Sequence, residues 1–176
     1  KVGLQGLFWS IAFLSILAML LVLSLQHSPP VIYYKFSLRA FKNIMTKELI
    51  VIDFSVFSLH LILAAGFIVM PILIVENQIV SMSDNWHLYL PAILLSFLGM
   101  LPLIVISEKF QKTKYILMLS ILLLIVTQLL FLNTNYNFSL FLATLTIFFI
   151  AFNSIEALLP SLLSRKASSE KRGLAM

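Results

Sequence analysis

The sequence has no cysteine and very little charge, and these two shortages exclude many kinds of protein. Without cysteine the chain forms no disulfide framework and no thiolate metal site. Charged residues make up only 11% of the chain, whereas a soluble globular domain carries about 25%. Hydrophobic residues make up 61% and the mean hydropathy is +1.05. A soluble core cannot bury so much apolar surface, so the composition indicates an integral membrane protein.

Sequence motifs for catalysis are missing as well. The chain has no His-Glu-x-x-His pair, no Gly-x-Ser-x-Gly turn and no phosphate-binding loop. No second metal ligand follows His60 at a helical spacing. We therefore expect neither an enzyme nor a bound cofactor or metal. The net charge of +5 does not indicate nucleic acid, because the basic residues lie between apolar runs, where they orient helices and contact lipid head groups.

Five apolar runs are present, and each is long enough to cross a bilayer, which takes about 20 residues in a helix. The runs are continuous and lack the alternation of a membrane β-strand. The sequence therefore predicts an all-α transmembrane fold. Its five membrane-spanning helices are expected at residues 7–25, 50–75, 88–107, 115–132 and 138–164.

Lysine and arginine are confined to alternate connections between these runs. Eleven of the twelve fall on one side: Lys35, Arg39, Lys42, Lys47, Lys109, Lys112, Lys114, Arg165, Lys166, Lys171 and Arg172. The positive-inside rule places that side in the cytoplasm. We expect a multi-pass protein of the cell inner membrane, with residue 1 outside and residue 176 cytoplasmic.

The sequence divides at the long basic connection. Residues 28–49 are expected to form a cytoplasmic linker, in which residues 36–45 have the pattern of an amphipathic helix. This linker separates one helix, in residues 1–27, from four helices in residues 50–176. The first residue adjoins a helix and the last five, "RGLAM", are typical of the approach to another span. We therefore expect a piece of a longer protein.

Three stretches resemble the major facilitator superfamily, and in particular the YajR-type members of its drug:proton antiporter branch. They are "FSLHLILAAGFIVMPILI", "LPLIVISEKFQKTKYILML" and "FFIAFNSIEALLPSLLSRKASSEKRGLAM". The resemblance implies that residues 1–27 are the last helix of the N-terminal half of a twelve-helix fold, and residues 50–176 the first four helices of its C-terminal half. It also implies a secondary transporter, working by alternating access and coupled to protons, for efflux of drug-like or metabolite molecules.

Glu156 is the first candidate for a proton-coupling or substrate residue. From Tyr115 to Ile155 the chain has no Lys, Arg, Asp or Glu, and this carboxylate follows that run. An ionised carboxylate in hydrocarbon costs several kcal/mol, from about 2.5 kcal/mol upward, so it must be protonated, paired or facing water. Asn153 lies three residues earlier and is expected to share its face. Pro160 frees the backbone carbonyl of Glu156, where the helix can kink. The alternative is a packing role for the same carboxylate.

His60 is the second intramembrane candidate. Its imidazole can titrate near neutral pH and so exchange protons or bind substrate, or it can be a histidine bonded to a neighbouring helix. Asp53, on the same run, is interpreted as an acid placed favourably near the positive end of the helix dipole. Among the apolar residues, Phe67, Met70 and Phe149 are candidates to line a drug pocket.

The cytoplasmic ends supply candidates for a gate. Glu108 and Lys109 end the third span, where they either pair with the start of a neighbouring helix or form a solvated turn. At this loop the chain departs from the family's Asp-Arg and Gly-Arg-Arg/Lys pattern. Arg172 is interpreted as a gate candidate or, alternatively, as an orienting charge.

Two interpretations of function follow. In the first, the partners are the lipid bilayer, a small-molecule substrate, protons and the missing helices of the same transporter, with no nucleic acid. In the second, the chain is a non-transporting structural or assembly protein of the membrane, whose polar residues join helices. The second interpretation predicts that His60 and Glu156 tolerate neutral replacement.

Overall fold

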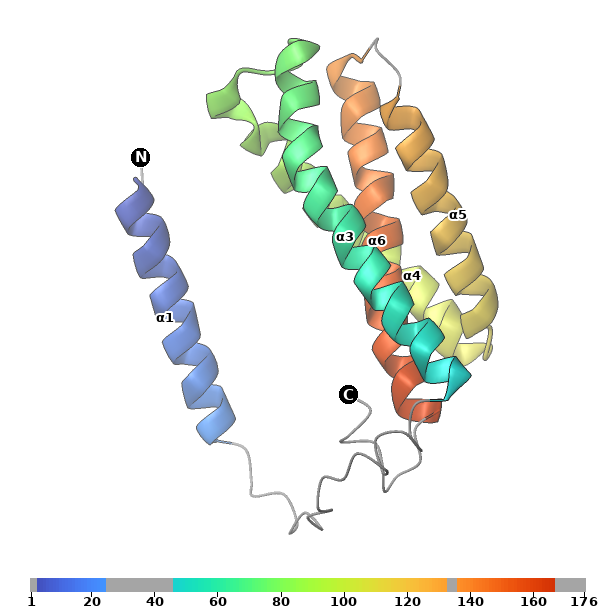
Figure 1. Ribbon diagram of the computed structural model, residues 1–176. Helices are drawn as coiled ribbons and strands as arrows, with labels where there is room; N and C mark the ends of the chain where they lie inside the picture. The colour runs from blue at the N-terminus through green and yellow to red at the C-terminus, as the bar shows by residue number, and fades with distance from the viewer. Residues whose placement is uncertain (1–2, 25–45, 133–135, 167–176) are drawn as a thin grey trace. The chain divides into compact units, whose positions relative to one another are not determined.

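Long helices dominate the structure, a computed structural model that describes residues 3–24, 46–132 and 136–166. Figure 1 shows the order α1 (Leu4–Leu23), α3 (Lys47–Glu76), the short 3-10 helix η1 (Met82–Asp84), α4 (Trp86–Lys109), α5 (Thr113–Phe131) and α6 (Phe138–Lys166). These described residues contain no strand. Within these described ranges, five helices are long and apolar enough to cross a membrane. The predicted all-α transmembrane fold with five spans is therefore confirmed, and every helix end lies within three residues of its predicted position.

The chain divides into two compact units, Lys1–Ser37 and Leu38–Met176. The first unit holds α1, a uniformly apolar helix whose large side chains are exposed. The predicted amphipathic helix at residues 36–45 lies outside the described residues, and the proposed domain limits at 27/28 and 49/50 stay predictions. The remaining description concerns the four long helices of the second unit.

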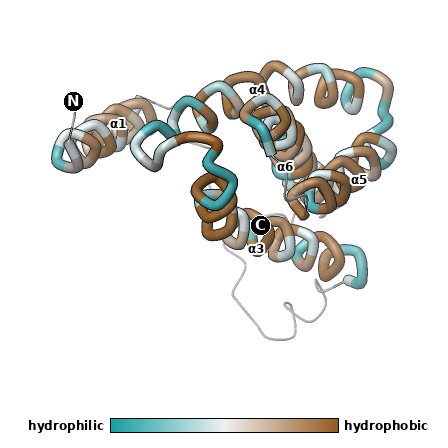
Figure 2. Tube along the Cα trace, turned by 90° about the horizontal axis from the view of Figure 1, so that it is seen from above, coloured by the Kyte–Doolittle hydropathy of each residue, from teal (hydrophilic) through white to brown (hydrophobic). Residues whose placement is uncertain are grey.

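Helix α6 is the centre of the four-helix unit. It packs most extensively on α4 and α5 and less extensively on α3. Figure 2, the view from above, shows α6 between these three helices. The large side chains with no exposed surface are concentrated on it, including Phe141, Leu145 and Phe148. Because this one helix supplies half of the buried apolar core, the position of each α6 side chain decides which neighbour it meets.

Helices α4 and α6 approach each other closely at Gly99. A Cβ atom at that position would lie 2.7 Å from Cγ1 of Ile150, which is closer than real Cβ atoms come to a neighbour. Small residues permit this kind of approach between membrane helices. Glycine at position 99 therefore lets α4 and α6 form a tightly joined pair, in contrast to the looser contact of α6 with α3.

The turn between α4 and α5 is stabilised by a buried hydroxyl pair. Ser107 donates to Thr113 at 3.0 Å, and the backbone N–H of Lys112 donates to the carbonyl of Ser107 at 3.0 Å. Gln111 has a φ of 55°, a left-handed conformation that closes the turn. These contacts fix the short turn that joins Lys109, the last residue of α4, to Thr113, the first residue of α5.

Candidate functional site

His60 is held in a defined orientation in the middle of α3. Its Nδ1 atom lies 2.9 Å from the backbone carbonyl oxygen of Val56, one turn earlier. A carbonyl only accepts hydrogen bonds, so this contact assigns the proton of the neutral imidazole to Nδ1. The ring of Phe152 on α6 meets the imidazole edge to face, at 6.3 Å between centroids. Both contacts leave Nε2 directed away from the backbone of its own helix.

Glu156 of α6 faces this free nitrogen. Its Oε1 atom lies 4.0 Å from Nε2 of His60, and the two side chains are 50% and 54% exposed. The distance is too long for a direct hydrogen bond but within the range of an ion pair when the imidazole is protonated. The structure thus brings together two predicted site residues that are 96 positions apart in the sequence.

A cleft between α3 and α6 opens beside the pair. Its volume is about 620 Å³. It is lined on α3 by Ile52, Asp53, Val56, Phe57 and His60, and on α6 by Leu159, Pro160 and Leu163. The walls are apolar, and Asp53 and His60 supply the titratable groups of the lining. Pro160 leaves α6 unbroken up to Lys166, and its ring forms part of the wall.

Asn153 points to a different neighbour from Glu156. Its side-chain nitrogen donates to the hydroxyl of Ser96 on α4 at 3.1 Å, and Ser96 in turn donates to the carbonyl of Ile93 at 2.7 Å. Ser96 has no exposed surface. The bond joins α4 to α6, so Asn153 makes a packing contact. A part for Asn153 in coupling stays a prediction.

Two of the gate candidates, Glu108 and Lys109, lie at the C-terminal end of α4. Ser161 of α6 donates to Oε1 of Glu108 at 3.5 Å, so this carboxylate faces the last turns of α6. The contact is with the end of a helix, whereas the sequence suggested the start of one. Lys109 lies over the ring of Phe110, with its nitrogen 5.8 Å from the centroid. Arg172 lies outside the described residues. A gating role for the three residues stays a prediction.

Two features of the site were missed from the sequence. Ser96 gave no signal, because a single serine in an apolar helix usually bonds its own backbone. Asp53 was interpreted through the helix dipole, on the assumption that the helix begins at residue 50. The helix begins at Lys47, and Glu48 occupies its first turn. Asp53 is therefore in the second turn, beyond the range over which the dipole acts strongly.

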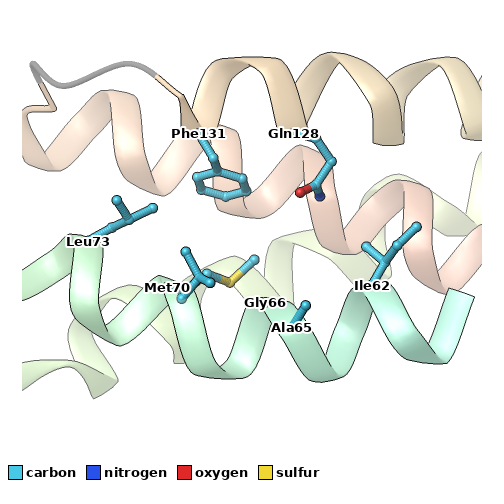
Figure 3. Close-up of a pocket in the computed structure, with 8 residues that line it drawn as sticks. Ile62, Ala65, Gly66, Met70, Leu73, Gln128 and Phe131 are labelled. Carbon is cyan, nitrogen blue, oxygen red and sulfur yellow. The ribbon is translucent and has the colours of Figure 1, made fainter.

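A second, smaller cavity lies between α3 and α5, with a volume of about 170 Å³. Figure 3 shows Gln128 and Phe131 of α5 facing Met70 and Gly66 of α3 across it. Met70, predicted as a pocket residue, lines this cavity, whereas Phe149 is buried in the core. The cavity shares no lining residue with the α3–α6 cleft, and the Gln128 amide is its one polar side chain. It is not part of the candidate site.

Comparisons with known proteins find similarity to two membrane transport proteins. It is 28% identical to the inner membrane transport protein YajR of Escherichia coli (strain K12), covering 100% of this chain and 40% of YajR. It is 30% identical to an uncharacterised transporter of Buchnera aphidicola subsp. Acyrthosiphon pisum (strain APS), covering 99% of this chain and 46% of that protein. No family model and no solved structure matches.

The chain therefore spans less than half the length of these curated relatives. The five apolar helices and the match to an inner-membrane protein support a multi-pass location in the inner membrane. The helical architecture fits a fold like that of the major facilitator superfamily. Along its whole length the chain is homologous to two membrane transport proteins, YajR and the Buchnera transporter.

Proposed function

We propose that this chain is part of a proton-coupled secondary transporter, which exports small drug-like or metabolite molecules by alternating access. The observation that carries the proposal is the His60–Glu156 pair, two titratable side chains facing each other across α3 and α6 within apolar spans. Intramembrane ionisable residues are usually functional, because their burial is costly without a partner or water. The homology to two transport proteins supports the same conclusion.

The pair offers a physical means of coupling protonation to movement. With His60 protonated and Glu156 ionised, the two helices attract each other; protonation of the carboxylate removes that attraction. Two unit charges 4 Å apart interact by about 1 kcal/mol in water and about 4 kcal/mol at an effective dielectric of 20. Because both side chains are half exposed, the smaller value applies while water reaches them. Closing the site against water would strengthen the attraction, so proton release and closure favour each other.

The contact between α3 and α6 is suited to such a movement. Helix α6 is packed more extensively on α4 and α5 than on α3. Alternating access in secondary transporters is largely the rocking of one helix group against another around a fixed site. We infer that α3 is the element that shifts and that the pair biases its two positions.

The test is Glu156→Gln in the full-length parent protein, in inverted membrane vesicles with ethidium as the probe. This change keeps volume and hydrogen bonding but removes proton exchange. We expect normal protein levels and proton-driven ethidium uptake reduced at least about tenfold, equivalent to about 1.4 kcal/mol in a barrier. Ethidium counterflow, which needs no net proton movement, should fall less.

Glu48→Gln is the matched control, since it removes the same charge from the first turn of α3, at a residue that does not line the cleft. Uphill transport by Glu156→Gln at the wild-type rate between pH 6 and 8 would contradict coupling and favour a packing role. Lack of proton-driven ethidium uptake by the wild-type protein would contradict the proposed export of drug-like compounds.

A further inference from the structure

We propose that the α3–α6 cleft is a water-filled proton path, in which Asp53 exchanges protons between the cytoplasm and the His60–Glu156 pair. The inference rests on the proposed function for the use of the protons, but the wet, acidic cleft can be tested without it. The proposal is based on the lining of the cleft. His60 lies at one end of it, and Asp53, a second titratable group, lies nearer the cytoplasmic end of α3.

Asp53 and His60 lie on one face of α3. They are seven residues apart, which is close to two helical turns, and the axial separation is about 10.5 Å at 1.5 Å per residue. Val56 and Phe57 lie between them on the same wall of the cleft. The two groups are therefore aligned along the cleft but too far apart for direct proton transfer.

Water can bridge this separation. Hydrogen-bonded oxygen atoms lie about 2.8 Å apart, so about three water molecules span the distance. A volume of about 620 Å³ accommodates about twenty waters at roughly 30 Å³ each. The apolar wall residues do not compete for the protons of such a chain, whereas Asp53 and His60 anchor its two ends.

The orientation of His60 suits a relay. Its Nδ1 proton is engaged by the Val56 carbonyl, so exchange takes place at Nε2, the nitrogen that faces Glu156. A proton leaving Oε1 of Glu156 through one water arrives at Nε2 and forms imidazolium. The imidazolium then releases that Nε2 proton along the water chain to the Asp53 carboxylate, which passes it to the cytoplasm. Each step moves one proton, and the second step restores the neutral imidazole.

No other charged group of the described residues lines the cleft. On α3 the lining includes Asp53 and His60, and on α6 the nearest titratable group is Glu156, beside His60. Helices α4 and α5 contribute no residue to the lining. Lys47 and Glu48 line a neighbouring hollow near the start of α3, which shares only Ile52 with the cleft. Within the described part of the chain, Asp53 makes no hydrogen bond or ion pair, so its carboxylate is available to solvent.

The cleft is tested first by cysteine accessibility in the full-length protein, with any cysteine elsewhere in the parent replaced by serine. Phe57 and Leu61 form a matched pair on α3, 63% and 59% exposed, but only Phe57 lines the cleft. A membrane-impermeant cationic thiosulfonate is applied from the cytoplasmic side. We expect Phe57→Cys to react at least about tenfold faster than Leu61→Cys. Equal, slow reaction of both would show a cleft filled by lipid or protein and overturn the proposal.

The charge of Asp53 is tested in the same preparation. In the Phe57→Cys background, Asp53→Asn should slow the reaction of the cysteine with the cationic reagent and speed its reaction with an anionic thiosulfonate. Glu48→Gln should change the ratio of these two reaction rates much less. This measurement needs no transported substrate. It therefore separates failure of the cleft from failure of the proposed function.

The relay is tested by proton-driven ethidium uptake. We expect Asp53→Asn to slow it about tenfold, Asp53→Glu to retain most of it, and millimolar formate to restore the rate of Asp53→Asn. A small permeant acid replaces a missing proton carrier but cannot replace a packing contact. Unchanged uptake by Asp53→Asn, with Glu156→Gln impaired, would overturn the relay and leave the proposed function intact. Slow uptake without rescue by formate or by glutamate would assign Asp53 a structural role instead.

Discussion

The hydrogen bond between Asn153 and Ser96 gives the sharpest prediction for stability. It joins α6 to α4 at 3.1 Å, and the Ser96 hydroxyl has no exposed surface. Hydrogen bonds between membrane helices average about 0.6 kcal/mol in double-mutant cycles and reach about 1.7 kcal/mol. Because Ser96 is fully buried and Asn153 is partly buried, water has little access to the hydroxyl that loses its partner. We therefore expect a coupling energy of about 1 to 1.7 kcal/mol.

The measurement is a double-mutant cycle of Ser96→Ala and Asn153→Ala in the full-length protein. The free energy of unfolding is followed on adding a denaturing detergent to mixed micelles. The cycle cancels the free-energy cost of the cavity that Asn153→Ala leaves, because this cost is present with serine and with alanine at position 96.

Ser154→Ala is the internal control. Ser154 is next to Asn153 and has no exposed surface, but its hydroxyl has no hydrogen-bond partner within the described residues. Its removal should cost little or increase stability slightly, because no bond is lost and a buried polar group disappears. A coupling energy below about 0.3 kcal/mol, within the usual error of additivity, would refute a stabilising bond. Equal losses for Ser96→Ala and Ser154→Ala would lead to the same conclusion.

Two further predictions concern topology and pH. Cysteine introduced at Gln111 should be labelled only from the cytoplasmic side, and cysteine at Ser83 only from outside; outside labelling at position 111 would reverse the orientation. Burial raises the pKa of Tyr136, outside the spans, although a hydrogen bond with Thr144 lowers it. Its contribution to stability is therefore complete below the unfolded pKa near 10 and is lost as pH rises through the folded pKa. Tyr136→Phe should flatten the decline of the unfolding free energy above about pH 10, and an unchanged decline would assign it to other groups.

The sequence predicted the five helices and their ends well, because the signals are local. A span is recognised from its own composition, and an end from the polar residues beside it. The start of α3 was placed three residues late for a local reason: Lys47 and Glu48 read as linker, whereas Thr46 caps the helix by accepting from the N–H of Leu49 at 3.3 Å. That small error changed the interpretation of Asp53.

The candidate site was predicted as single residues and not as an arrangement. Glu156 and His60 stood out because each is a titratable group in an apolar run. Their contact depends on how α3 crosses α6, which no spacing within either helix specifies. Asn153 and Glu156 are three residues apart, about 60° on a helical wheel, and a helix packed on several sides sends such a pair to different neighbours. Asn153 consequently contacts α4, while Glu156 faces α3.

Helix α6 is thus joined to its neighbours in two different ways. Towards α4, the close approach at Gly99 and the Asn153–Ser96 bond fix its position. Towards α3, the polar contact is a pair 4.0 Å apart beside an open cleft. A change of one charge has little effect on the first contact, since neither group there titrates, whereas it creates or removes the attraction across the second. In the proposed transporter, protonation would therefore move α3 relative to a fixed α4–α6 pair, and substitutions at Ser96 should alter stability much more than proton coupling.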